Sequence, residues 1–170
     1  LGETWVEDGE APDWQQLLER REDYRIGTVP HGGLLLVGGA DVQKDRIEVS
    51  VWAFGRGKEA WLVDHSVLMG DTTRDAVWKQ LAAMLAETWT HACGAQLPLA
   101  RFAIDTGFAT QEAYAFVRAC RDSRVMAVKG AARGAALIGT PTAVDVSIGG
   151  KKLRRGLKLY AVTVGIAKQE

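Results

Sequence analysis

Two apolar, strand-like runs of this chain each end on an aspartate. The first covers residues 34–40 and ends at Asp41, and the second covers residues 99–104 and ends at Asp105. Buried strands that bring carboxylates to one end of a sheet create an oxygen-rich site, and Mg²⁺ prefers oxygen ligands while it keeps several of its waters. The pattern therefore predicts metal-assisted phosphoryl chemistry. The competing interpretations are structural: Asp41 as a turn residue together with Gln43, and Asp105 as a helix cap or turn residue.

The composition favours one folded domain without an overall charge. Of the 170 residues, 47% are hydrophobic and 25% are charged, which suits a globular domain with a sizeable core. The 21 Lys and Arg balance the 21 Asp and Glu, so binding to a polyanion has to come from a local cluster of charge. No apolar run approaches the roughly 20 residues of a membrane-spanning helix. Because the chain begins at Leu1 without a signal-like segment, we expect a cytosolic fragment of a longer protein.

The order of the expected elements predicts a mixed α/β sheet flanked by helices. Residues 1–33 are expected to form a linker arm, with a short helix over residues 14–24, and residues 34–170 to form the folded domain. Apolar periodicity in that domain predicts strands over residues 34–41, 46–54, 59–68, 99–104, 124–128, 143–148 and 156–164, and helices over residues 71–90 and 110–120. The first three strands should form an antiparallel meander, after which helices and strands alternate. This order is the ribonuclease H-like one, and it makes Asp41 and Asp105 neighbours if their strands pair.

The clearest local excess of positive charge lies at the last expected hairpin, whose turn is predicted at residues 149–152. Its five cations within eight residues are Lys151, Lys152, Arg154, Arg155 and Lys158. Because phosphate neutralisation supplies most sequence-independent affinity for DNA, a cationic hairpin near the acidic site would hold a duplex against it. Lys129 and Arg133 are weaker candidates for the same role. The competing interpretation is a solvated turn.

Four blocks of sequence occur in an order that is typical of one protein family. They are residues 39–49 (GADVQKDRIEV), 59–65 (EAWLVDH), 104–107 (IDTG) and 125–130 (VMAVKG). Together they resemble the nuclease domain of the large terminase subunit of lambda-type phages, the GpA family, and the resemblance covers essentially the whole chain. Residues 1–33 are similar to that family's link from its ATPase domain. No Gly-x-x-x-x-Gly-Lys-Ser/Thr motif occurs in this chain, so this part of such a protein would cut DNA without pumping it.

The resemblance implies a ribonuclease H-like endonuclease that cuts concatemeric double-stranded viral DNA during packaging. It implies two Mg²⁺ or Mn²⁺ ions as cofactors and, through the full-length protein, the terminase small subunit and the portal as partners. The expected location is the cytoplasm of the infected bacterium, without membrane association. Two other functions stay open: a DNA-binding or assembly module of the same fold with weakened catalysis, and another ribonuclease H-like nuclease of the transposase or resolvase type. Metal-dependent cleavage separates the module from a nuclease.

Asp41 and Asp105 are the residues that the resemblance makes catalytic and metal-binding. Asp41 is expected to bridge the two ions because it ends the central first strand, and Asp105 is expected to bind one of them. The family has a third acid on or just after its last strand, where this chain carries Gly165. That departure allows a loss of the acid, a shifted ligand such as Glu170, a ligand outside this chain, or a different alignment. Asp64 is a further candidate ligand, which faces either the site or solvent.

Three polar residues near these aspartates are expected to lie outside the site. Glu48 and Asp45 flank the first turn and are predicted to be solvated. His65 is one of three histidines, none of which has metal-motif spacing, and it is predicted to be a surface or strand residue.

Overall fold

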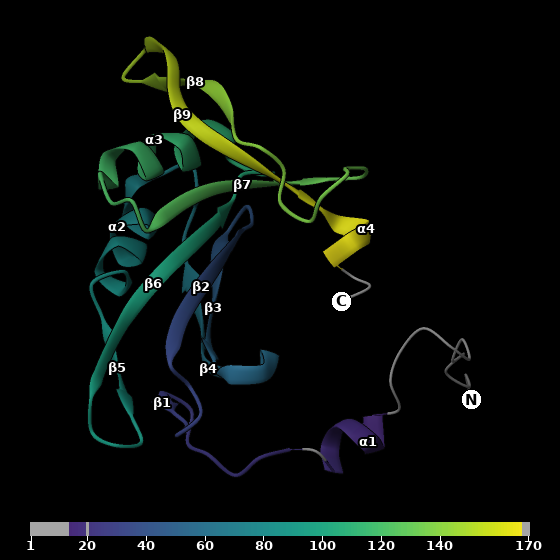
Figure 1. Ribbon diagram of the computed structural model, residues 1–170. Helices are drawn as coiled ribbons and strands as arrows, with labels where there is room; N and C mark the ends of the chain where they lie inside the picture. Colours follow the sequence, from purple (N-terminus) through teal and green to yellow (C-terminus); the bar gives the residue numbers. More distant parts are fainter. Residues whose placement is uncertain (1–13, 20, 168–170) are drawn as a thin grey trace, which may run out of the picture.

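A long, curved sheet forms the body of the molecule in the computed structural model, which describes residues 14–19 and 21–167 (Figure 1). In chain order the elements are α1 (Trp14–Glu19), β1 (Thr28–Val29), β2 (Leu35–Val42), β3 (Arg46–Phe54), the 3₁₀ turn η1 (Arg56–Lys58), β4 (Ala60–Met69), α2 (Asp75–Met84), β5 (Thr88–His91), β6 (Gln96–Asp105), α3 (Thr110–Cys120), β7 (Val125–Ala131), β8 (Thr142–Ile148), β9 (Lys151–Thr163) and α4 (Val164–Ala167). The predicted mixed α/β architecture is confirmed.

The strand order explains how the two aspartates come together. The main path of the sheet runs β4-β3-β2-β6-β7-β9-β8 among the described residues, and β5 joins β1 to β6 beside it. β2, β3 and β4 form the predicted antiparallel meander. β6 is parallel to β2, β7 is parallel to β6 and β9 is parallel to β7. The carboxyl ends of these four strands therefore lie along one edge, as expected for a ribonuclease H-like sheet.

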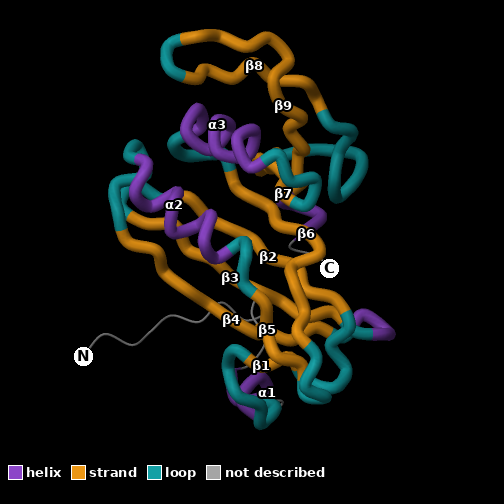
Figure 2. The backbone as a smooth tube through the Cα atoms, turned by 90° about the vertical axis from the view of Figure 1, so that its left-hand side faces the viewer, coloured by secondary structure: helices purple, strands orange, loops and turns teal. Residues whose placement is uncertain are grey.

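Helices α2 and α3 cover one face of this sheet (Figure 2). The strands alternate, so that Val49 and Val51 of β3 point into the core with Val77 and Leu81 of α2. At Gly38 of β2 a Cβ atom would lie 2.5 Å from a ring carbon of Phe102, so glycine is what allows β2 to close on β6. The opposite face carries the polar members of the alternation, and neither α2 nor α3 covers it.

The helix predicted over residues 71–90 is wrong at both ends. Asp71 accepts hydrogen bonds from the backbone N–H and the hydroxyl of Thr73, which forms a turn, and α2 begins only at Asp75. The helix ends at Met84, and Thr88–His91 form β5 instead. Trp89 is buried between two exposed threonines, which is the period of a strand, and it pairs with Leu97 of β6. Trp89 also follows Leu85 by four residues, an interval that fits a helix, which is why the predicted helix extended to residue 90.

Two further boundaries differ from the sequence-based expectation. The first helix ends at Glu19 instead of residue 24. The last hairpin turns at Gly149 and Gly150, whose φ angles of 55° and 77° suit a tight hairpin turn, and β9 begins directly at Lys151. The basic residues therefore lie on a strand instead of in a loop.

The second half of the expected linker arm is attached to the folded domain. Glu22 accepts a hydrogen bond from the indole N–H of Trp61 at 2.9 Å, and Tyr24 donates one to the carbonyl of Leu62 at 2.8 Å. β1 then pairs in parallel with β5.

Within the described ranges no helix is long and apolar enough to cross a membrane.

Candidate active site

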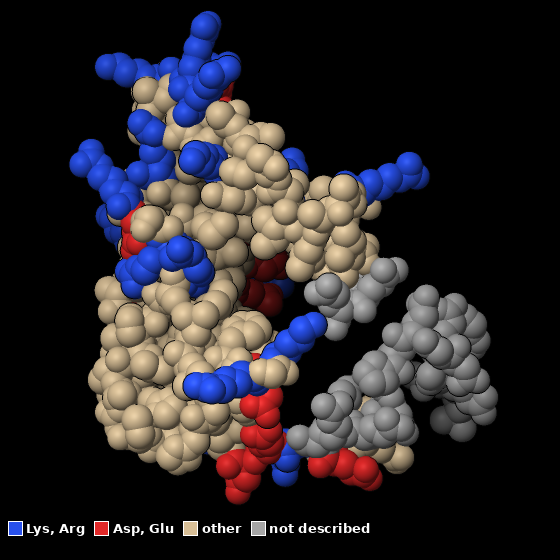
Figure 3. Space-filling model, in the orientation of Figure 1, with Lys and Arg blue, Asp and Glu red and all other residues tan. Residues whose placement is uncertain are grey.

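The register of β2 and β6 places Asp41 beside Asp105. The two strands run parallel with Ala40 opposite Ile104, and each aspartate is the next residue of its strand. Both carboxylates line one hollow of about 360 Å³ on the face of the sheet away from α2 and α3. In Figure 3 acidic side chains are visible in this recess. The strand pairing that was needed to make the two aspartates neighbours is confirmed.

A third carboxylate, that of Glu48, lines the same hollow. Glu48 lies directly opposite Asp41 in the antiparallel β2–β3 pair, so the row across the sheet reads Glu48, Asp41, Asp105. Glu48, predicted as a solvated residue beside the first turn, keeps a side chain that is 34% exposed, but it lies on β3 and faces the hollow. The sequence did carry a signal: residues 41 and 48 are equally far from the centre of the turn at Lys44 and Asp45, which makes them cross-strand partners.

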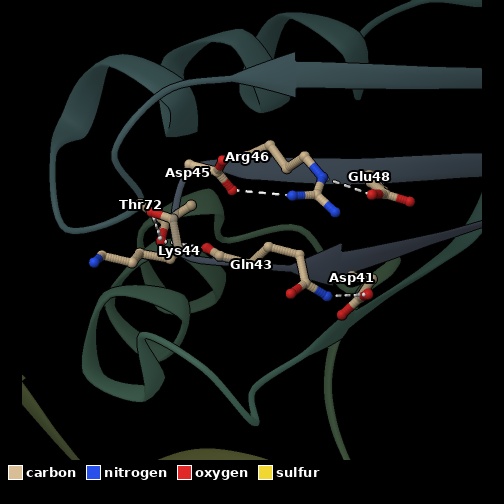
Figure 4. Close-up of polar contacts among 7 residues, drawn as sticks. All are labelled: Asp41, Gln43, Lys44, Asp45, Arg46, Glu48 and Thr72. Carbon is tan, nitrogen blue, oxygen red and sulfur yellow. Dashed lines mark hydrogen bonds and ion pairs between the residues drawn. The ribbon is translucent and has the colours of Figure 1, made fainter.

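Each carboxylate of the row is held by a hydrogen bond from its own strand or from the turn that follows. Gln43 donates through Nε2 to Oδ2 of Asp41 at 2.6 Å, and the backbone N–H of Gly107 donates to Oδ1 of Asp105 at 3.2 Å. Arg46 donates through Nε to Oε1 of Glu48 at 2.7 Å (Figure 4). These bonds orient one oxygen of each group and leave the other for further ligands.

The donor chemistry of the hollow fits a hard divalent cation. All three charged groups offer oxygen, and Mg²⁺ is usually held by one or two carboxylates together with water and substrate phosphates. In the described part of the chain, no three His, Cys, Asp or Glu side chains converge closely enough to enclose a metal by themselves. A metal ion held by these carboxylates would therefore need water or a substrate phosphate as further ligands.

His65 and Ser50 form the polar floor next to the carboxylate row. The two residues are cross-strand partners on β4 and β3, and Ser50 Oγ lies 3.1 Å from His65 Nδ1. Both line the hollow, which the sequence did not indicate for either residue. The sequence does not reveal the register of β4 against β3. The alternation of β4 alone therefore could not show which of its two faces meets the site.

Asp64 lies on the other face of β4. It is paired with the buried Val51, and its Oδ2 accepts a hydrogen bond of 3.2 Å from the indole N–H of Trp89. Among the described residues it is not part of the lining of the hollow. Asp64 therefore serves the packing of β5, and the structure does not bring it to Asp41 and Asp105. Glu170, the other candidate ligand, lies outside the described residues.

Gly165 follows β9 in the short helix α4. In the described part of the chain, a Cβ atom built on Gly165 meets no other atom within 4 Å, so an aspartate has room there. Gly165 is not among the described residues that line the hollow. The identity of a third family acid therefore stays a prediction.

Comparison with known proteins shows the family to which this chain is similar. The family described as "Terminase large subunit gpA, endonuclease domain" matches residues 1–170. The chain belongs to this family. It is 32% identical over 173 residues to the large terminase subunit of Escherichia phage lambda, a match that covers 100% of this chain and 26% of the relative. The corresponding protein of Enterobacteria phage P21 is 31% identical over 172 residues, covering 99% of this chain and 25% of the relative.

This terminase domain thus spans about a quarter of the length of the curated relatives that it matches. No solved structure matches it. The family assignment favours the terminase interpretation over the transposase or resolvase type.

The cationic hairpin of this terminase domain leans toward the helices instead of toward the hollow. Gln111 of α3 accepts a hydrogen bond from the backbone N–H of Ser147 at 2.9 Å, and Arg118 of α3 donates to the carbonyl of Gly156. The tip of the hairpin borders a groove of about 470 Å³ together with α2 and α3. Figure 2 shows β8 and β9 projecting past α3. The tip of the hairpin therefore lies at the helix-side groove, and none of the five cations is among the described residues that line the hollow. Their contact with DNA stays a prediction.

Asp145 of β8 already engages part of this positive charge. Its Oδ1 accepts a hydrogen bond of 2.9 Å from the backbone N–H of Arg155, and its Oδ2 lies 3.1 Å from Nζ of Lys152. These two contacts, the backbone bond first, lower the pKa of Asp145 below its usual value. Lys151 and Arg154 are thus better available for a phosphate than Lys152.

Lys129 and Arg133 lie at the same end of the sheet as the carboxylates. Lys129 directly follows Val128, which pairs with Asp105 and lines the hollow. The segment that carries Arg133 is fixed to the end of β9, since Thr163 donates through its hydroxyl to the carbonyl of Ala136 at 2.7 Å. Because Val128 faces the hollow, the alternation of β7 turns Lys129 toward the other face of the sheet. Neither Lys129 nor Arg133 is among the described residues that line the hollow, and their contact with DNA stays a prediction.

Proposed function

We propose that this domain is a metal-dependent endonuclease that hydrolyses phosphodiester bonds of double-stranded DNA during viral DNA packaging. The observation that carries the proposal is the row of Glu48, Asp41 and Asp105 across three adjacent strands, in a chain of the gpA endonuclease family. The names of the relatives support the packaging role. In the full-length protein, the small terminase subunit and the portal would supply the choice of site, in the cytoplasm of the infected cell.

The chemistry follows from the position of the three carboxylates. Two Mg²⁺ or Mn²⁺ ions held there would lower the pKa of the attacking water and stabilise the leaving oxygen. Asp41 stands between Glu48 and Asp105, so it is the carboxylate that both ions would share, with one outer carboxylate for each. The attacking water releases one proton to solvent as its oxygen bonds to phosphorus, the bond from phosphorus to the 3′ oxygen breaks, and that oxygen takes up a proton from solvent.

The experiment that tests the proposal is plasmid cleavage by this domain with Mg²⁺, Mn²⁺ or EDTA. We expect nicked and linear DNA with either metal and intact plasmid in EDTA, because the carboxylates cannot activate water unaided. Gly165→Asp belongs in the same assay. Cleavage that appears only in this variant would favour the second candidate function, a DNA-binding or assembly module whose catalysis is weakened by the glycine at that position. Cleavage in EDTA would contradict both.

The hairpin should contribute to DNA affinity more than to the cleavage step. Lys151→Glu combined with Arg154→Glu should weaken duplex binding and flatten its salt dependence, with a decrease in slope of about 0.9 for each phosphate that is no longer neutralised. Because the hairpin leans toward α3, the cleavage rate at saturating DNA should hardly change. Fluorescence anisotropy over a series of salt concentrations measures the slope.

A matched control for the hairpin variant is Arg56→Glu combined with Lys58→Glu. It reverses two exposed cations in the turn between β3 and β4. Its binding curve should keep the wild-type slope. An unchanged slope in the hairpin variant as well would refute the role of the hairpin.

A further inference from the structure

One cation is bonded directly to the carboxylate row. Arg46 begins β3, two residues before Glu48, so the alternation of the strand puts both side chains on the face of the hollow. Its Nε donates to Oε1 of Glu48 at 2.7 Å and its Nη1 donates to Oδ1 of Asp45 at 3.0 Å. Figure 4 shows the guanidinium between these two carboxylates. A positive group is thus fixed at the rim of an otherwise acidic recess.

The guanidinium keeps donors for a further partner. Arginine has five N–H groups in a planar fork, and the two bonds of Arg46 employ only Nε and Nη1. Its side chain remains 37% exposed. Such a fork can hold a carboxylate along one edge and a phosphate with the remaining N–H groups, which a lysine ammonium cannot do in a fixed geometry.

In the absence of bound metal, the recess presents mainly negative charge to DNA. Glu48, Asp41 and Asp105 place three negative charges where a DNA phosphate has to approach, and Asp45 adds a fourth nearby. Like charges repel an incoming polyanion, while a prealigned donor attracts it and stabilises charge that develops on its oxygens.

We propose that Arg46 binds a phosphate oxygen of the DNA at the carboxylate row, and that Glu48 holds the guanidinium ready for it. The proposal rests on the proposed nuclease function and adds to it a residue that contacts the substrate. It also assigns Arg46 a second effect: in the absence of DNA its bond to Oε1 leaves only Oε2 of Glu48 for a metal ion, so Arg46 weakens metal binding at that carboxylate.

Arg46→Gln tests both effects, because it should lower the affinity for DNA and raise the affinity for Mn²⁺. Duplex affinity in EDTA should fall about fivefold, and the salt slope should decrease by about 0.9, because one phosphate is no longer neutralised. The affinity for Mn²⁺ alone, measured by calorimetry without DNA, should rise by roughly two- to fivefold, since an exposed ion pair of Glu48 is removed. The cleavage rate at saturating DNA and Mn²⁺ should fall about 100-fold, the usual effect of deleting a donor to the reacting group.

Two companion variants separate phosphate binding from general charge. Arg46→Lys should restore most of the salt slope but little of the cleavage rate, because it keeps the charge and removes the fork. Arg74 is an exposed cation just before α2, and it lines the groove on the helix side of the sheet. Arg74→Gln removes this cation and should behave as wild type. Thermal melting should be the same for all variants, because exposed ion pairs contribute little to stability.

The outcomes are distinct from those of the nuclease proposal. Wild-type affinity and slope in Arg46→Gln would overturn the phosphate contact and leave Arg46 as a surface ion pair. A lower affinity for Mn²⁺ in that variant would overturn the competition for Glu48. Either result is compatible with a working nuclease, whose own failure would appear as cleavage that persists in EDTA whatever stands at position 46.

Discussion

Asp41→Asn is expected to reduce metal-dependent plasmid cleavage by about 1000-fold or more, equivalent to about 4 kcal/mol of transition-state stabilisation. Asp41 is the central carboxylate of the row, with Glu48 and Asp105 on the adjacent strands. An amide in its place has one neutral oxygen, which binds a divalent cation far less well than a carboxylate that two ions can share. The measurement is the initial rate of plasmid nicking at saturating Mn²⁺.

The fold of this variant should be intact. The amide oxygen of asparagine can still accept the bond that Gln43 now donates to Asp41, and one of three neighbouring negative charges disappears. Thermal melting at the wild-type temperature or above it would show this. A rate above a tenth of the wild-type value would contradict the assignment of Asp41.

Asp64→Asn is the matched control for Asp41→Asn. It makes the same chemical change in the same sheet, but on the face that packs against Trp89. Its amide oxygen can still accept the indole N–H, so both folding and cleavage should be close to wild type. Loss of cleavage in this control would make Asp64 part of the site after all.

The sequence was sufficient for the features that depend on local pattern. The alternation over residues 46–54 matched β3 in full, and Thr110–Cys120 matched α3, because each pattern fits one kind of element. The two strand-end aspartates were found for the same reason. Trp89 was misplaced because an apolar residue at a helical interval from Leu85 also fits a strand, and only its pairing with β6 decides between the two.

The remainder of the site depends on contacts between distant residues. Glu48 enters through the register of β2 and β3, which a hairpin count could have supplied. The position of the cationic hairpin depends on Gln111 and Arg118, which bind it from α3 across 36 and 38 residues of sequence. The basic residues of β9 predict affinity for phosphate, but their sequence does not show in which direction the β8–β9 hairpin projects from the sheet.

Asp105→Asn is expected to weaken metal binding more than it impairs the fold. Asp105 is an outer member of the row, so Asp41 and Glu48 still offer two carboxylates to a metal after the substitution. We expect the Mn²⁺ concentration for half-maximal cleavage to rise by at least the roughly 10- to 100-fold that follows when a group that only supports a metal ligand is removed. The backbone N–H of Gly107 can still donate to the amide oxygen, which keeps the turn before α3 in place.

Titration of cleavage with Mn²⁺ distinguishes this outcome from a simple loss of activity. The variant should approach a measurable rate at high metal concentration, whereas Asp41→Asn should stay inactive over the same range. Asp75→Asn, which neutralises an exposed acid in the first turn of α2 on the helix side, is the control and should keep the wild-type titration. An unchanged midpoint in Asp105→Asn would remove Asp105 from the metal ligands and leave Asp41 and Glu48 as the pair that holds the ion. In that case the carboxylate of Asp105 would serve the turn at Gly107, which is the structural interpretation that competes with catalysis at this position.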